Sequence, residues 1–182
     1  MNKIINCEIS KENTPYTKKF DHSENNRNSF RKWNPFKNTL SAAVACGLEL
    51  IPINKNTSLL CIGDLEPNSY LNLLDLVENK QKIFCLTKIS SSIFQQKNLF
   101  QFDNLNESIT KFSVIYIDKY EYSYESIQNI TKSFLNSGGY LLLEHGYDQK
   151  DRIVKLLEES YTSIKTFKDL NKVDRAVLAK LR

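Results

Sequence analysis

Long apolar segments are absent from this chain of 182 residues. No run approaches the roughly 18 apolar residues that a membrane-spanning helix needs, and no basic-then-apolar leader opens the sequence. The hydrophobic content of 41% is ordinary for a globular protein, and the length is that of one domain with a substantial core. We therefore expect a soluble intracellular protein that does not insert into a membrane.

Cysteine and glycine are both scarce. The four cysteines show no metal-ligand spacing, so we expect no metal site and predict that the thiols are reduced and buried. Of only five glycines, Gly63 stands alone in the turn after an apolar strand, where a nucleotide-binding loop would have two or three. Asp64, Glu66 and Pro67 follow it closely. This turn therefore departs from the pattern of a glycine-rich phosphate-binding loop.

The net charge of +4 is concentrated in the first 38 residues, which carry eight basic side chains against four acidic ones. The remaining residues carry 17 of each sign. Residues 1–29 mix polar residues without a period, so we predict a basic polar arm that is mostly disordered, followed by a folded domain at residues 30–182. Such an arm suits contact with phosphates or an acidic partner, and a solvated tail is the alternative.

Strands and helices alternate in the predicted structure. Helices are expected between Pro35 and Pro52 and at residues 68–77, 90–96, 123–135 and 148–160. Strands are expected at residues 57–62, 82–86, 99–102, 112–118 and 140–144, with a closing hairpin at 163–167 and 175–181. This order predicts an α/β fold, a Rossmann-like parallel sheet with helices on both faces and a C-terminal antiparallel hairpin. Ligands bind such a sheet where its parallel strands end, which groups four positions, Gly63, Thr87, Asp103 and Asp118.

Two parts of the sequence resemble known methyltransferases. Residues 30–43, Phe-Arg-Lys-Trp-Asn-Pro-Phe-Lys-Asn-Thr-Leu-Ser-Ala-Ala, resemble the entry motif of the fibrillarins, the RNA 2′-O-methyltransferases of box C/D ribonucleoproteins. Residues 138–149 and 169–178 are similar to segments of the release-factor glutamine methyltransferases. The resemblance implies the class I fold of S-adenosylmethionine-dependent methyltransferases, and the fibrillarin likeness covers more of the chain.

The resemblance implies a reduced active site. Fibrillarins use a Lys-Asp-Lys-His set around the ribose hydroxyl, and the corresponding positions here are Thr39, Asp118, Gly146 and Arg175. Asp118 is thus the one candidate catalytic residue that the resemblance retains, and Gly63 and Asp103 are the candidate cofactor contacts. Side-chain carboxylates after Gly63 would repel the carboxylate of the cofactor, so we expect weak cofactor binding or none. Glu144 and His145 are an alternative acid–base pair, or simply part of the scaffold.

Three functions follow from these observations. The first is a degenerate, non-catalytic subunit of an RNA–protein complex that contacts RNA or a partner protein through Arg31, Lys32, Trp33 and Lys37. The second is an active enzyme that methylates RNA 2′-hydroxyls or a protein glutamine with S-adenosylmethionine. The third is a different small-molecule binder on the same sheet. For the first, the cytoplasm or a ribonucleoprotein compartment is the expected location.

Overall fold

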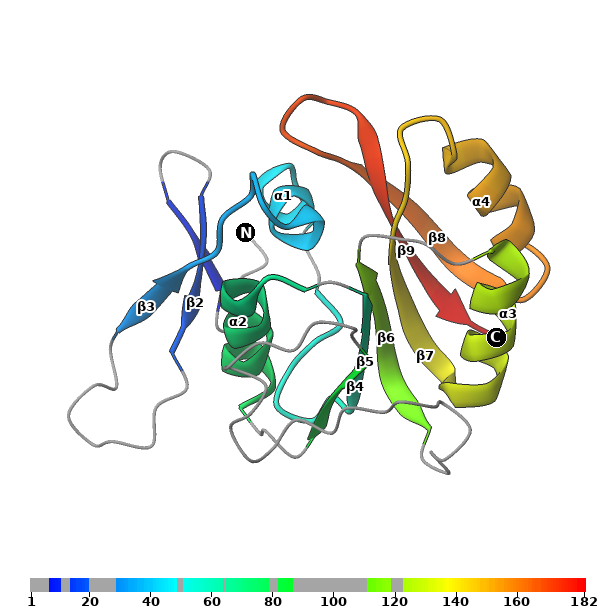
Figure 1. Ribbon diagram of the computed structural model, residues 1–182, viewed down its shortest axis with the longest axis horizontal. Helices are drawn as coiled ribbons and strands as arrows, with labels where there is room; N and C mark the ends of the chain where they lie inside the picture. The colour runs from blue at the N-terminus through cyan, green and yellow to red at the C-terminus, as the bar shows by residue number, and fades with distance from the viewer. Residues whose placement is uncertain are drawn as a thin grey trace.

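A computed structural model describes residues 7–10, 14–19, 29–48, 51–63, 65–78, 82–86, 111–118 and 123–182 (Figure 1). The predicted helix at 90–96 and strand at 99–102 lie outside these residues, as do Asp64, Thr87 and Asp103. Six strands form one sheet in the order β5-β4-β6-β7-β9-β8, and three short strands form a second sheet in the order β1-β2-β3.

The strands of the large sheet are β4 (Leu59–Gly63), β5 (Ile83–Leu86), β6 (Phe112–Asp118), β7 (Leu135–Glu144), β8 (Tyr161–Lys168) and β9 (Asp174–Leu181). The small sheet contains β1 (Cys7–Ile9), β2 (Pro15–Lys18) and β3 (Phe30–Lys32). The helices are α1 (Thr39–Ala45), α2 (Pro67–Val77), α3 (Tyr124–Phe134) and α4 (Lys150–Leu157).

Both faces of the large sheet are covered, as predicted. Strands β5, β4, β6 and β7 run parallel, while β9 pairs antiparallel with β7 and with β8. Alternate residues of the buried strands point to opposite faces, because the side chains of a strand repeat every two residues. Residues such as Leu59 and Val114 pack with α1 and α2, and residues such as Leu60 and Ile115 pack with α3 and α4. The class I methyltransferase sheet with its terminal hairpin is confirmed.

Part of the predicted disordered arm is folded, which corrects that prediction for residues 7–9 and 15–18. Strand β2 pairs with β1 on one side and β3 on the other. The Thr17 hydroxyl donates to Asp75 Oδ2 in α2 at 2.8 Å, and Arg31 Nε donates to the same oxygen at 2.9 Å. Asp75 is buried, so this carboxylate fixes the small sheet to the domain by two hydrogen bonds, one of them charged. The predicted domain boundary at residue 30 therefore separates β1 and β2 from β3, although all three strands belong to one sheet.

Helix α1 is shorter than predicted. We expected the helical stripe to continue to Pro52, but the helix ends at Ala45. Gly47 has a φ of +109°, and the amide of Leu48 donates back to the carbonyl of Ala43 at 2.8 Å. This is a glycine-terminated helix end, in which a residue of positive φ turns the chain out of the helix. The apolar residues after Gly47 pack from a non-helical segment.

The cysteines were predicted to be buried. Cys61 and Cys85 are buried, as predicted, whereas Cys46 at the end of α1 is exposed and contradicts the prediction. Within the described ranges, no group of histidine, cysteine and acidic side chains is placed to hold a metal ion. None of the helices there is long and apolar enough to cross a membrane.

Candidate functional site at the carboxyl edge of the sheet

The carboxyl edge of the large sheet, where β4 and β6 end, brings two of the predicted site residues together. Gly63 and Asp118 are direct partners across the parallel pair. Gly63 has a φ of +111°, and a Cβ atom at this position would lie 1.8 Å from the Asp118 carbonyl oxygen. No side chain fits there, so the glycine is required for the close approach of the two strands. The Asp118 side chain is 2% exposed.

Asn38 joins helix α1 to this edge. Its Oδ1 accepts from the Ser41 amide at 2.9 Å and caps the helix, while its Nδ2 donates to the Tyr116 hydroxyl at 3.0 Å. Burial is the main cause that raises the pKa of Tyr116 well above its ordinary value, with the charges of Asp118 and Glu144 adding to it. Tyr116 therefore stays protonated and anchors the cap two residues before Asp118.

Helix α2 begins beside the loop that would receive a cofactor. Glu66 occupies the cap position without a side-chain cap bond, and Pro67 is the first helical residue. Lys37 Nζ lies 3.1 Å from Glu66 Oε1. The predicted repulsion by Glu66 is therefore partly offset by a cation that the sequence did not assign to it. Pro67 has no amide hydrogen to donate and Lys37 is already paired with Glu66, so the described residues at the start of α2 are a poor match for the carboxylate of S-adenosylmethionine.

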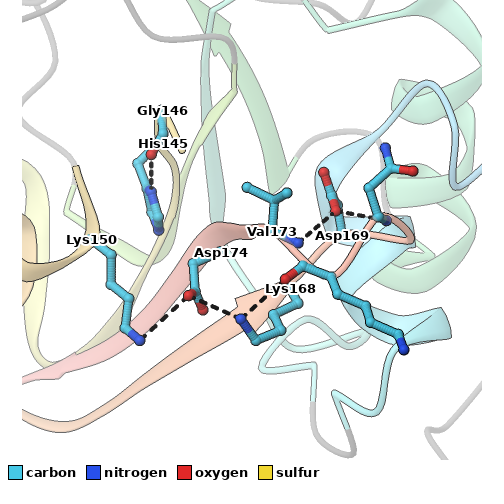
Figure 2. A network of polar contacts seen from close by, with 9 residues as sticks. His145, Gly146, Lys150, Lys168, Asp169, Val173 and Asp174 are labelled. Carbon is cyan, nitrogen blue, oxygen red and sulfur yellow. Dashed lines mark hydrogen bonds and ion pairs between the residues drawn. The ribbon is translucent and has the colours of Figure 1, made fainter. Parts of the chain in front are cut away.

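His145 is buried immediately after β7. Its Nδ1 lies 2.7 Å from the Gly146 carbonyl oxygen, as Figure 2 shows, and because a carbonyl only accepts, this nitrogen carries the proton. Nε2 has no hydrogen-bond partner among the described residues. The imidazole is 2% exposed. A buried ring held by the backbone agrees with the scaffold alternative for Glu144 and His145.

Asp174 at the start of β9 binds two lysines. Lys150 Nζ lies 3.4 Å and Lys168 Nζ 3.1 Å from Asp174 Oδ2, and the two ammonium groups reach it from α4 and β8 (Figure 2). Burial opposes ionisation, but the hydrogen bonds and charges of Lys168 and Lys150 outweigh it and lower the pKa of Asp174. Nearby, Arg175 Nε lies 3.5 Å from Asp169 Oδ2. Three cations, Lys150, Lys168 and Arg175, are thus engaged by acids of the β8–β9 hairpin.

The four predicted contact residues for RNA or a partner have different environments. Trp33 is fully buried, which corrects its assignment to a binding surface. Arg31 is held by Asp75, and Lys37 is held by Glu66. Lys32 is exposed. The side chain of Phe36 is 84% exposed, although the preceding turn is fixed by Asn34 Oδ1, which accepts from the Phe36 amide at 3.0 Å.

Asn38 was missed by the analysis of the sequence, although a signal for it exists. An asparagine immediately before Thr39-Leu40-Ser41 is a regular helix cap, but the helix was expected between Pro35 and Pro52, with its start before Asn38. The lysines around Asp174 lie 24 and 6 residues from it in the sequence. Their convergence depends on the β8–β9 hairpin and on the docking of α4.

Parts of this chain are similar in sequence to known methyltransferases. The fibrillarin-like rRNA/tRNA 2′-O-methyltransferase of Pyrobaculum calidifontis is 30% identical over 67 residues, which are 37% of this chain and 28% of that protein. The release factor glutamine methyltransferase of Francisella tularensis is 47% identical over 51 residues, which are 28% of this chain and 18% of that protein. The match therefore spans less than a third of the length of these curated relatives.

The solved structures support the same fold over nearly the whole chain. Methanococcus jannaschii fibrillarin superimposes with a TM-score of 0.71 and 16% identity, covering 92% of this chain and 88% of the other. Aeropyrum pernix fibrillarin with natively bound S-adenosyl-L-methionine gives a TM-score of 0.71 and 15% identity, covering 98% and 100%. The family model described as Fibrillarin matches residues 1–105, which is more than half of the sequence. This chain belongs to the fibrillarin family.

Proposed function

We propose that this chain is a non-catalytic member of the fibrillarin family that acts as a binding or structural subunit of an RNA–protein complex. The proposal rests on the difference between an intact scaffold and an altered reaction edge. Asn38 joins the start of α1 to β6, Trp33 is fully buried, and Gly63 allows β4 and β6 to approach each other closely. The residues that would handle the ribose hydroxyl differ from those of the family at three of four positions.

The pairing of charges at the carboxyl edge is the observation that carries this proposal. Fibrillarin chemistry uses two lysines and a histidine around the aspartate, and here Thr39, Gly146 and Arg175 stand in their places. Arg175 is engaged by Asp169, and the Lys150 and Lys168 side chains are engaged by Asp174. Asp118 itself is buried. Among the described residues, this edge offers a substrate hydroxyl no lysine at the family's positions, and the retained carboxylate of Asp118 is not accessible as a general base.

The second candidate is an active S-adenosylmethionine-dependent methyltransferase acting on RNA. The ion pair between Lys37 and Glu66 favours it, because a cation beside the loop offsets one of the two carboxylates expected to repel the cofactor. Gly63 and Asp103 would then be the cofactor contacts and Asp118 the polar residue nearest the transfer. The cofactor supplies the methyl group, and the chain would orient the acceptor.

Titration calorimetry with S-adenosylmethionine and S-adenosylhomocysteine tests the proposal. No heat of binding at about 1 mM ligand is expected, because this limit corresponds to less than about 4 kcal/mol of binding free energy. A dissociation constant below about 100 μM would overturn the non-catalytic proposal, and methyl transfer from labelled cofactor to RNA would establish the alternative. The same preparation should bind single-stranded RNA without cofactor. Failure to bind RNA in low salt would contradict the binding role.

A further inference from the structure

A polar groove lies at the amino edge of the large sheet, opposite the carboxyl edge. It has a volume of about 340 Å³ and lies where β4, β6 and β7 begin. Three stretches of chain form this groove, which we call the amino-edge groove. Its principal polar residues are Asn54, Asn56, Ser113, Asn136 and Ser137. This volume lies at the lower end of the range of small-molecule sites in proteins.

An irregular start of β7 creates the groove. Phe112 of β6 pairs with Leu135, but the next register pair is Val114 with Tyr140. Residues 136–139 are therefore displaced from the ladder opposite the single residue Ser113, an irregularity larger than the usual bulge of two residues against one. Gly139 closes the bulge, because a Cβ atom there would lie 2.9 Å from the Ser113 carbonyl oxygen. The Gly-Gly pair thus shapes this groove at the edge remote from the candidate methyl-transfer site.

The opposite wall of the groove is fixed by side-chain hydrogen bonds. Asn54 Oδ1 accepts from the Asn56 amide at 2.9 Å, and the Asn54 amide donates to the Thr57 hydroxyl at 2.9 Å. The hydroxyls of Ser58 and Ser113 lie 3.0 Å apart and tie the residue before β4 to the second residue of β6. The wall is thus held in one arrangement before any ligand arrives, which lowers the entropic cost of binding.

Among the described residues, the lining contains amide and hydroxyl groups and no aspartate, glutamate, histidine or cysteine. General acid–base chemistry and metal binding are therefore not served by it. Neutral donors and acceptors are suited to sugar hydroxyls, and the half-buried ring of Tyr140 supplies an apolar surface at the side.

Three lysines lie close to residues that line the groove. Lys55 lies between the two asparagines of its wall, and Lys82 Nζ lies 3.2 Å from the Lys55 carbonyl oxygen. Lys180 Cε lies 3.8 Å from the Cβ position of Gly138, with its Nζ 5.8 Å from the centre of the Tyr140 ring. In the described part of the chain, none of the three forms an ion pair. Their positive field favours a ligand that carries phosphate.

We infer that the amino-edge groove binds a ribose phosphate, with the sugar on the asparagine and serine side chains and the phosphate on Lys55 and Lys180. The unit comes either from a free nucleotide or from an RNA strand. This binding is independent of cofactor binding, because the groove lies at the opposite edge of the sheet. It goes beyond the proposed function by giving the chain a second contact for RNA.

The test uses the whole chain and two probes, adenosine monophosphate in calorimetry and a fluorescent uridine octamer in anisotropy. Asn136→Asp places a negative charge in the groove without changing the shape of the side chain, and we expect about a tenfold loss of affinity. Asn129→Asp makes the same change on the exposed face of α3 and is expected to leave affinity within twofold. Equal losses in the two variants would overturn the proposal.

A second pair of variants measures the phosphate contacts. Lys55→Gln with Lys180→Gln should lower the slope of log affinity against log salt for the RNA by about 1.4, which corresponds to two lost contacts with a single strand. Lys155→Gln with Lys165→Gln, two exposed lysines of α4 and β8, should not lower it. Binding of the octamer alone would identify an RNA site, and binding of both probes in competition would identify a nucleotide site. No binding of either at 1 mM would overturn the inference.

Discussion

At the carboxyl edge of the sheet, charged side chains pair with one another, whereas at the amino edge neutral side chains line a groove and lysines lie close to them. Glu66, Asp169 and Asp174 each hold a cation of their own edge. Lys55 and Lys180 at the other edge have no acid partner among the described residues. The family resemblance therefore predicts a site at the edge where these three acids are already paired with cations. The surface available for a phosphate is at the opposite end of the same strands.

Substituting Gly63 should break the carboxyl edge outright. In Gly63→Ala, the new Cβ atom would overlap the Asp118 carbonyl oxygen at a φ of +111°, so we expect a loss of more than about 3 kcal/mol in the free energy of unfolding. Gly47→Ala is the matched control, because Gly47 has a φ of +109° with nothing within 4 Å of its Cβ position. It should cost about 1 kcal/mol. Equal losses in urea denaturation would show that positive φ, rather than strand contact, sets the cost.

Removing the Tyr116 hydroxyl should weaken the same edge by less. Tyr116→Phe leaves Asn38 Nδ2 without its acceptor, and we expect a loss of about 1–2 kcal/mol. The pH dependence sharpens this test. Because the folded-state pKa of Tyr116 is raised, mainly by burial, its stabilising contribution is complete below about pH 10 and is lost as the pH rises toward the raised value. The variant should therefore show a smaller fall in stability above pH 10, measured by urea denaturation at several pH values.

Freeing the two lysines of Asp174 should make the carboxyl edge behave more like the amino edge. Asp174→Asn removes two ion pairs, and both lysines in them are partly exposed. The free energy of unfolding should therefore change by less than about 1 kcal/mol. The pKa of Asp174 is lowered, so its small contribution is present above its ordinary value and is lost as the pH falls through the lowered one. RNA affinity should rise about threefold with the added positive charge. An unchanged RNA affinity would separate this edge from RNA binding.

The fold was predictable from local patterns, and the site was predictable only in part. Strand β6 was assigned with its observed bounds, Phe112–Asp118, because an uninterrupted apolar run is typical of a parallel strand buried on both faces. That Gly63 and Asp118 lie at the same edge was predicted, because parallel strands end together where ligands bind, but their direct pairing was not. The burial of Trp33 and the pairing of Lys37 with Glu66 did not follow, because both depend on contacts between segments distant in the sequence. The bulge of β7 was missed because the strand was predicted only for residues 140–144, whereas β7 begins at Leu135.

The attachment of the small sheet through Asp75 also constrains the order in which the chain can assemble during synthesis. Thr17 and Arg31 precede their common acceptor by 58 and 44 residues. Strands β1 to β3 leave the ribosome before the helix that holds them, since synthesis proceeds from the N-terminus at about 5–20 residues per second. The first strands of the protein must therefore wait several seconds for the carboxylate that fixes their position. During that interval the small sheet is not yet attached to the rest of the domain.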